Sequence, residues 1–280
     1  MNATRIARLT LLALCLSAFG LTGHAQDKPA AQEYQPEVGQ SGKDVVWVPT
    51  PQALVDKMLN LARVTPRDYV IDLGSGDGRT VITAVKRGAR ALGIEYNPDM
   101  VALSQRNAAK EGVGDKAKFM KADLFETDFS QATVITMFLL PDINIKLRPK
   151  ILDMKPGTRI VSNSFTMGEW QHERSAKATE KEGCQSYCTA YLWIVPAKVE
   201  GTWKLADGEL KLKQDFQNFS GTLTAGGRQT AVKGRLYGDR INFKAGDSQY
   251  TGRVNGDAIQ GTVKSGGGAG EWSATRTAKG

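Results

Sequence analysis

A cluster of glycines behind an acidic residue is the feature of this chain best suited to chemistry. Asp72 follows the apolar residues Val70 and Ile71, and glycines then stand at positions 74, 76 and 78. Glycine lets the backbone approach a ligand closely or adopt positive φ. A loop between a strand end and a helix start is where open α/β sheets bind nucleotides. The spacing differs from the G-x-G-x-x-G of nicotinamide and flavin sites.

Two further acids follow the next two apolar segments. Glu95 lies about 20 residues beyond the glycine loop, where an acid can accept hydrogen bonds from ribose hydroxyls. Asp123 can accept from the exocyclic amine of an adenine, and Leu124 and Phe125 offer an apolar slot for the ring. An acid at a strand end is more often a cap or turn residue, and Glu95 would also suit an NAD ribose. Asp123 and the glycine spacing favour a nucleoside ligand other than NAD.

Alternating strands and helices must position these acids. We expect parallel strands over residues 69–73, 91–95, 116–121, 132–140 and 158–162. We expect helices over residues 51–62, 79–86, 98–111 and 142–154. Segments 174–180 and 189–195 read as a closing hairpin. This order predicts an α/β fold with a doubly wound, Rossmann-like sheet of seven strands.

The pattern changes on both sides of this predicted domain, which we place at residues 45–197. Residues 26–44 are rich in Gln, Pro, Lys and Glu, which predicts a flexible linker. Residues 198–280 contain short alternating segments with Gly-Asp and Asp-Gly turns, which predicts a small antiparallel all-β domain. We interpret this domain as a structural or partner-docking module, and a sugar- or lipid-binding barrel is the alternative.

The first 25 residues have the pattern of a secretory signal peptide. Arg5 and Arg8 precede an apolar run from Leu9 to Phe19, and small residues flank His24 before a cleavage site after Ala25. We therefore expect an exported, periplasmic protein. The alternative is an uncleaved membrane anchor through residues 9–25, which would keep the protein close to a membrane.

Composition and cysteine content bear on three further features: nucleic-acid partners, metal sites and disulfides. The formal net charge is +8, but the basic residues are scattered, so we expect no nucleic-acid partner. Cys184 and Cys188 stand four residues apart without a second Cys/His pair, which is a poor zinc pattern, and we expect no metal site. In an oxidising compartment the two cysteines predict a disulfide, and two free thiols are the alternative.

The glycine loop and its acids resemble motif I of the class I S-adenosylmethionine (SAM) methyltransferases. Over residues 48–196 the chain further resembles the protein-lysine methyltransferases of the mitochondrial ATP synthase c-subunit type and their bacterial relatives. That closer resemblance is carried by the segments Val48–Pro51, Asp72–Arg79, Leu139–Pro141 with Asn144, Leu147–Lys150, Met167–Trp170 and Tyr191–Pro196.

The resemblance implies a SAM cofactor, a protein lysine as methyl acceptor, and two groups of site residues. The cofactor group comprises Thr50, Asp72, Gly74, Ser75, Gly76, Glu95, Asp123 and Leu124. The substrate group comprises Thr136, Leu140, Pro141, Asn144 and Trp170. No catalytic base is identified. Ser164 stands where relatives carry an acid before Phe165, so the alternative is an exported, non-catalytic binding module whose β domain docks an envelope partner.

Overall fold

The computed structural model describes residues 33–280. The predicted signal peptide and the linker residues up to 32 lie outside the described residues. The chain divides into two units, residues 1–33 and residues 34–280, and the fold below is that of the second.

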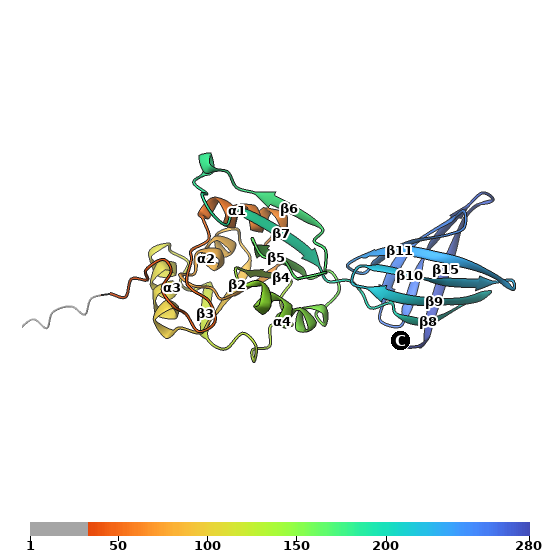
Figure 1. The fold of residues 1–280 in the computed structure, drawn as a ribbon, viewed down its shortest axis with the longest axis horizontal. Helices are drawn as coiled ribbons and strands as arrows, with labels where there is room; N and C mark the ends of the chain where they lie inside the picture. Colours follow the sequence, from red (N-terminus) through yellow and green to blue (C-terminus); the bar gives the residue numbers. More distant parts are fainter. Residues whose placement is uncertain (1–32) are drawn as a thin grey trace, which may run out of the picture. The chain divides into compact units, whose positions relative to one another are not determined.

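Seven strands form the sheet of the first domain, in the order β3-β2-β1-β4-β5-β7-β6 (Figure 1). They are β1 (Tyr69–Leu73), β2 (Arg90–Glu95), β3 (Ala117–Lys121), β4 (Val134–Met137), β5 (Arg159–Asn163), β6 (Arg174–Lys177) and β7 (Thr189–Ile194). The first five strands are parallel, whereas β7 pairs antiparallel with both β5 and β6. The predicted α/β fold with a closing hairpin is therefore confirmed.

Helices cover both faces of this sheet because side chains alternate along each strand. The helices are α1 (Gln52–Leu61), α2 (Arg79–Lys86), α3 (Pro98–Lys110) and α4 (Pro141–Leu152). Val70 of β1 packs in one core cluster with residues of α1 and α2. Ile71 and Leu73 point to the other face and share a second cluster with Leu147 of α4.

The strand order reverses direction at β1, which places a crevice at that point. β1 pairs with β2 on one side and with β4 on the other, so the chain segments that leave these strands diverge over opposite faces of the sheet. Ligands of open α/β sheets bind at the carboxyl ends of the strands beside such a switch point. Asp72, Glu95 and Asp123 all lie at this edge, where β1, β2 and β3 end.

A disulfide closes the tip of the hairpin between β6 and β7. Cys184 and Cys188 are bonded, which confirms the predicted pair. A short 3₁₀ helix, Glu180–Glu182, precedes the bonded loop. Because Asn163 at the end of β5 pairs with Ala190 near the start of β7, this tip lies at the same edge of the sheet as the crevice.

The disulfide closes a loop of only about five residues in the unfolded chain. Its reduction should therefore lower the free energy of unfolding by about 2 kcal/mol. Urea unfolding of the oxidised protein and of a Cys184→Ser/Cys188→Ser variant would measure the difference. A loss well above this value would mean that the two cysteines stabilise more than their own loop.

The second domain is a closed antiparallel barrel of eight strands. These are β8 (Gly201–Leu205), β9 (Gly208–Asp215), β10 (Asn218–Ala225), β11 (Arg228–Tyr237), β12 (Arg240–Ala245), β13 (Ser248–Asn255), β14 (Ala258–Ser265) and β15 (Gly268–Ala278). Trp203, Phe219, Phe243 and Trp272 fill its interior, which confirms the predicted all-β domain.

The barrel contacts the sheet domain at the edge opposite the crevice. Ala197 donates a backbone hydrogen bond to Gly238 across 2.9 Å, beside the turn that leads into β5. The ring of Trp170 stacks on that of Phe216 with centroids 6.0 Å apart. Arg235 of β11 pairs with Glu173 at 2.7 Å.

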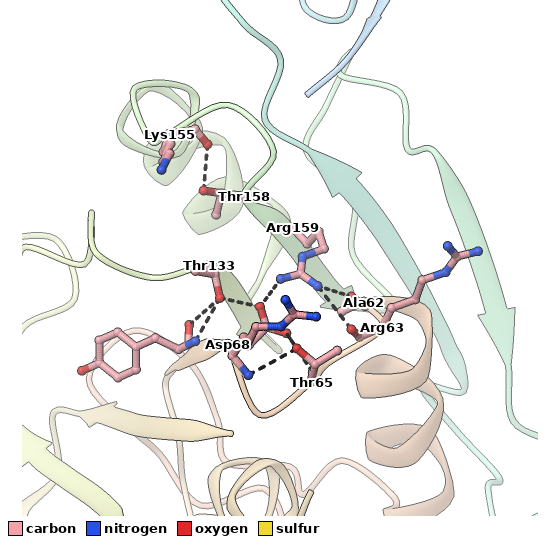
Figure 2. Close-up of polar contacts among 10 residues, drawn as sticks. Ala62, Arg63, Thr65, Asp68, Thr133, Lys155, Thr158 and Arg159 are labelled. Atoms are coloured by element: carbon pink, nitrogen blue, oxygen red, sulfur yellow. Dashed lines mark hydrogen bonds and ion pairs between the residues drawn. The ribbon is translucent and has the colours of Figure 1, made fainter. Parts of the chain in front are cut away.

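A buried acid ties together the amino ends of β1, β4 and β5 (Figure 2). The carboxylate of Asp68 accepts hydrogen bonds from Thr133 Oγ1 at 2.8 Å and from the backbone N–H of Thr65 at 2.8 Å, and it pairs with Arg159. Burial by itself raises the pKa of Asp68, but these hydrogen bonds outweigh burial and hold the pKa below its ordinary value. This cluster stabilises the fold from the side away from the crevice.

One strand is shorter than expected from the sequence. The apolar run at residues 132–140 predicts one long strand, but β4 covers only Val134–Met137. Residues 138–140 instead line the crevice before α4 begins. Within residues 33–280, no helix combines the length and apolar character needed to cross a membrane.

Candidate functional site

The glycine loop forms the floor of the crevice. Gly74, Gly76 and Gly78 all have positive φ, at 74°, 54° and 83°. The N–H groups of Gly74 and Ser75 donate to the carbonyl of Ile94 at 2.9 and 3.1 Å, which fastens the loop to β2. A Cβ on Gly76 would come within 2.9 Å of Trp47 Nε1. The loop therefore needs glycine both for its backbone conformation and for the space above it.

Glu95 is held in place by the same loop. Its carboxylate accepts from the backbone N–H of Gly76 at 3.0 Å and from that of Asn97 at 3.0 Å. These bonds orient the side chain at the carboxyl end of β2, where it lines the crevice. A carboxylate positioned in this way can still accept hydrogen bonds from two adjacent hydroxyls, because each oxygen has more than one acceptor site.

Asp72 lies deeper, at the carboxyl end of β1. It is 6% exposed and accepts a hydrogen bond of 2.6 Å from Thr136 Oγ1. Burial raises the pKa of Asp72 to about 7, although the hydrogen bonds from Thr136 and Thr80 act in the opposite direction. The nearby charges of Asp77 and Glu95 raise it further. A bound cation beside Asp72 would stabilise its ionised form.

The third acid is already paired with a basic residue. Lys43 forms a salt bridge with Asp123, and the hydrogen bond from Lys43 is the main reason that the pKa of Asp123 is lowered. The Lys43 ammonium also lies 4.5 Å from the centre of the Tyr96 ring. A ligand amine that binds to Asp123 would have to displace or share this lysine.

Lys43 belongs to a segment that we expected to be a flexible linker up to residue 44. The structure differs from this expectation from Tyr34 onward. Gly39 donates to the carbonyl of Trp47 at 2.8 Å and Trp47 donates to that of Gln40 at 2.9 Å, which makes a small turn. The carbonyl of Tyr34 accepts from Arg106 of α3 at 3.2 Å. Residues 42–50 of this segment line the crevice.

These residues fit SAM. Its ammonium group, its ribose hydroxyls and its adenine amine each need an acceptor, and Asp72, Glu95 and Asp123 supply three acidic ones along adjacent strands. The hydroxyl of Ser75 is buried and has no hydrogen-bond partner within the protein. A buried polar atom without a partner is costly unless a ligand or water satisfies it. This orphaned hydroxyl lies in the loop expected to contact the cofactor.

The structure brings together all eight residues predicted to contact the cofactor. They line one crevice: Thr50, Asp72, Gly74, Ser75, Gly76, Glu95, Asp123 and Leu124. Thr50 is held by Asn163, which donates to Thr50 Oγ1 at 3.2 Å, and by Arg79, which donates to the Thr50 carbonyl at 2.8 Å. The role of each residue in binding stays a prediction.

The predicted substrate residues are not brought together. Leu140 lines the crevice, but Thr136, Pro141, Asn144 and Trp170 do not. Thr136 is buried behind Asp72, and Asn144 is buried with its Nδ2 group 3.2 Å from the carbonyl of Thr166. Trp170, predicted on the substrate side, packs against Phe216 of the barrel at the opposite edge, so the structure does not bring it to the crevice.

Sequence reasoning missed several residues of the crevice. Lys43, Trp47 and Tyr187 all line it, and none belongs to a pattern that marks a ligand site. Within the described part of the crevice lining there is no histidine. Residues 33–280 also contain no group of three or more His, Cys, Asp or Glu side chains placed to hold a metal ion.

Comparisons with known proteins agree with this geometry. A family model described as the ANTKMT methyltransferase domain matches residues 72–174. A protein-lysine N-methyltransferase of Saccharolobus islandicus is 41% identical over 154 residues, which cover 54% of this chain and 94% of that protein. The human lysine N-methyltransferase named for the ATP synthase c-subunit is 34% identical over 125 residues, which cover 44% of this chain and only 53% of that protein.

A solved structure extends the comparison to the bound cofactor product. An RNA methyltransferase from Salinibacter ruber, in complex with S-adenosyl-L-homocysteine (SAH), is 46% identical to this chain. The match covers 54% of this chain and 96% of that one, with a TM-score of 0.50.

Proposed function

Because the chain belongs to the family of SAM-dependent methyltransferases that includes the S. islandicus protein-lysine N-methyltransferase, we propose that it methylates the side-chain amine of a protein lysine. The observation that carries the proposal is the crevice, where three carboxylates surround a glycine loop with an unpaired, buried Ser75 hydroxyl. SAM supplies a methyl group activated by its sulfonium, so the protein mainly has to bind, orient and exclude water.

In the proposed reaction, the lysine nitrogen forms a bond to the methyl carbon. The bond from that carbon to sulfur breaks, its electron pair stays on sulfur to give SAH, and the nitrogen then releases a proton to water. Glu95 and the glycine loop would fix the nucleoside, and Asp72 would balance the ammonium group. Such alignment can lower the barrier by roughly 7–11 kcal/mol.

The amine must be neutral before it can react. With an ordinary lysine pKa of about 10.4, roughly one amine in a few thousand is neutral near pH 7. Desolvation in an apolar environment lowers an amine pKa and raises that fraction. We propose that water takes up the proton that the amine loses and that the surroundings of the amine set its pKa.

We also propose that the protein acts outside the cytosol. The apolar segment after Arg5 and Arg8 supports export, and the disulfide between Cys184 and Cys188 is of a kind that persists in oxidising compartments. A fusion of alkaline phosphatase after Lys43 should be active in the periplasm. An inactive fusion of normal abundance would contradict export.

The affinity for SAM should rise with pH through neutrality. Asp72 is largely protonated below about pH 7 in the free protein, and a bound ammonium group favours its ionised form. Binding therefore releases a proton, and we expect affinity to increase about five- to tenfold between about pH 6 and 7.5. Calorimetric titration at several pH values measures this. An Asp72→Asn variant should show no such slope, and an equal slope in both proteins would contradict the assignment.

Methyl transfer itself is tested with SAM carrying a tritiated methyl group. Envelope proteins and total RNA, supplied separately, serve as acceptors. We expect label in protein, recovered by mass spectrometry as methylated lysine and abolished when the acceptor lysines are first blocked by acetylation. Label in RNA instead would favour the chemistry named for the S. ruber relative. Binding of SAM without any transfer would favour the non-catalytic alternative.

A further inference from the structure

Three aromatic rings from three separate segments meet on one wall of the crevice. Phe138 follows β4, Phe165 follows β5 and Tyr187 lies in the disulfide-closed loop. The ring centroids are 5.2 Å apart for Phe138 and Tyr187, 5.9 Å for Phe165 and Tyr187, and 6.0 Å for Phe138 and Phe165. All three rings line the same crevice as Asp72 and Glu95.

This aromatic wall, defined as Phe138, Phe165 and Tyr187, is not part of a described hydrophobic core. None of the three rings belongs to either core cluster of the sheet domain. Tyr187 is 45% exposed, and both phenylalanines are partly exposed. Apolar rings that gather at a crevice without being buried point to a ligand that covers them.

The position of the wall indicates which ligand this is. The acids and the glycine loop that fit the nucleoside come from β1, β2 and β3 and the segments that follow them. The wall comes from the segments beside β4, β5 and β7, on the other side of the strand switch point. The second reactant must approach from a side that the nucleoside does not occupy, and the wall lies on such a side.

The chemistry of the rings suits a lysine side chain. The face of an aromatic ring attracts an alkylammonium group, and its apolar surface packs against the methylene stem. Attraction to the ring face favours the charged amine as it arrives, whereas removal of water from around it acts in the opposite direction and lowers the amine pKa, as the proposed reaction requires.

We propose that the aromatic wall binds the lysine side chain of the acceptor, and that the Cys184–Cys188 disulfide holds Tyr187 in the wall. The proposal rests on the lysine methyltransferase function proposed above. It makes Tyr187 a substrate-binding residue and the disulfide a positioning element for it.

The loop geometry explains why a disulfide is needed there. Tyr187 has φ of 53°, which a non-glycine residue keeps only when its surroundings hold it. Cys184 is buried in the core of the sheet domain, and Cys188 packs against the same cluster. The bond between them thus clamps the backbone that carries Tyr187. A dithiol reductant would open it by giving two electrons and two protons to the two sulfurs, itself becoming a disulfide.

The test uses the full chain saturated with SAH and with its aromatic rings labelled for NMR. The probe is a blocked tripeptide whose central residue is Nε-trimethyl-lysine, and the neutral comparison is the same peptide with norleucine. We expect the signals of the wall rings to shift saturably with the cationic peptide. Replacing Tyr187 by alanine should weaken that binding about three- to tenfold, while Tyr187→Phe should keep most of it. Tyr237→Ala removes an exposed tyrosine of the barrel and should change nothing.

The disulfide is tested with the Cys184→Ser/Cys188→Ser variant and, independently, with wild-type protein reduced by a dithiol. Both should lose cationic-peptide binding to the extent that Tyr187→Ala does, while SAH affinity and circular dichroism stay unchanged. Three results would overturn the proposal: equal binding of the norleucine peptide, no shift of any wall ring, or a parallel loss of SAH affinity in Tyr187→Ala, which would assign the wall to the cofactor.

The proposed function fails in a different way. If the chain does not act on lysine, the tritium experiment shows no methylated lysine whatever the peptide binds. If only the wall is misassigned, Tyr187→Ala methylates lysine with the KM of the wild type.

Discussion

Replacement of Glu95 by alanine is expected to weaken SAH binding at least about 100-fold, since two charge-assisted hydrogen bonds to a ligand contribute roughly 1.5–3 kcal/mol each. The carboxylate has two roles that the methyl group of alanine cannot fill. It accepts from the N–H of Gly76, which holds the glycine loop, and it offers acceptors at the end of β2. Calorimetric titration of the purified variants with SAH measures the loss.

Two matched variants separate these roles. Glu95→Gln keeps one acceptor and the shape of the side chain, so its affinity should lie between those of wild type and Glu95→Ala. Glu271→Ala removes an exposed acid from the barrel and should bind SAH normally. Wild-type affinity in Glu95→Ala would show that the crevice does not hold the nucleoside as described.

Replacement of Asp68 by alanine is expected to lower the free energy of unfolding by about 3–5 kcal/mol, the usual result of removing one partner from a buried ion pair. Asp68 is 6% exposed, and its loss leaves Arg159 without its carboxylate at the amino end of β5 (Figure 2). Thr133 and Thr65 also lose an acceptor. Urea unfolding followed by circular dichroism measures the difference.

The pH dependence identifies the cause. Because the folded protein holds the pKa of Asp68 below its ordinary value of 3.8, the unfolded chain takes up this proton first as the pH falls. The stabilisation is therefore complete above that value and is lost as the pH drops through and below it. The difference between wild type and Asp68→Ala should shrink in this acidic range. A constant difference would mean that alanine acts through packing rather than through the charge.

Much of the crevice around the glycine loop could be predicted because its determinants are local. β1 and α2 have the bounds expected from the sequence, and the glycine loop lies between them. The carboxyl ends of parallel strands lie at one edge of the sheet. Once β1, β2 and β3 were identified, the acids at their ends, Asp72, Glu95 and Asp123, were therefore expected to lie close together.

The aromatic wall that we propose for the acceptor could not be predicted because it depends on packing between distant segments. Trp170 belongs to a motif of the family, yet its place is set by contact with Phe216 of the barrel. Tyr187 belongs to no recognisable pattern, and only the fold of the hairpin brings it beside Phe138 and Phe165. Composition predicts a flexible linker at Lys43, and nothing in its local sequence indicated the salt bridge with Asp123 that places its side chain at the crevice.

The closure of the barrel has a practical consequence for altering this chain. β15 pairs with both β14 and β8, so the first and last strands of the barrel complete one hydrogen-bonded ring. Deletion of β15 would leave two strands with unpaired backbone groups, which recruit strands of other molecules. Such a truncated protein should self-associate even though its crevice is untouched, so a shortened form would better end before β8 than inside the ring.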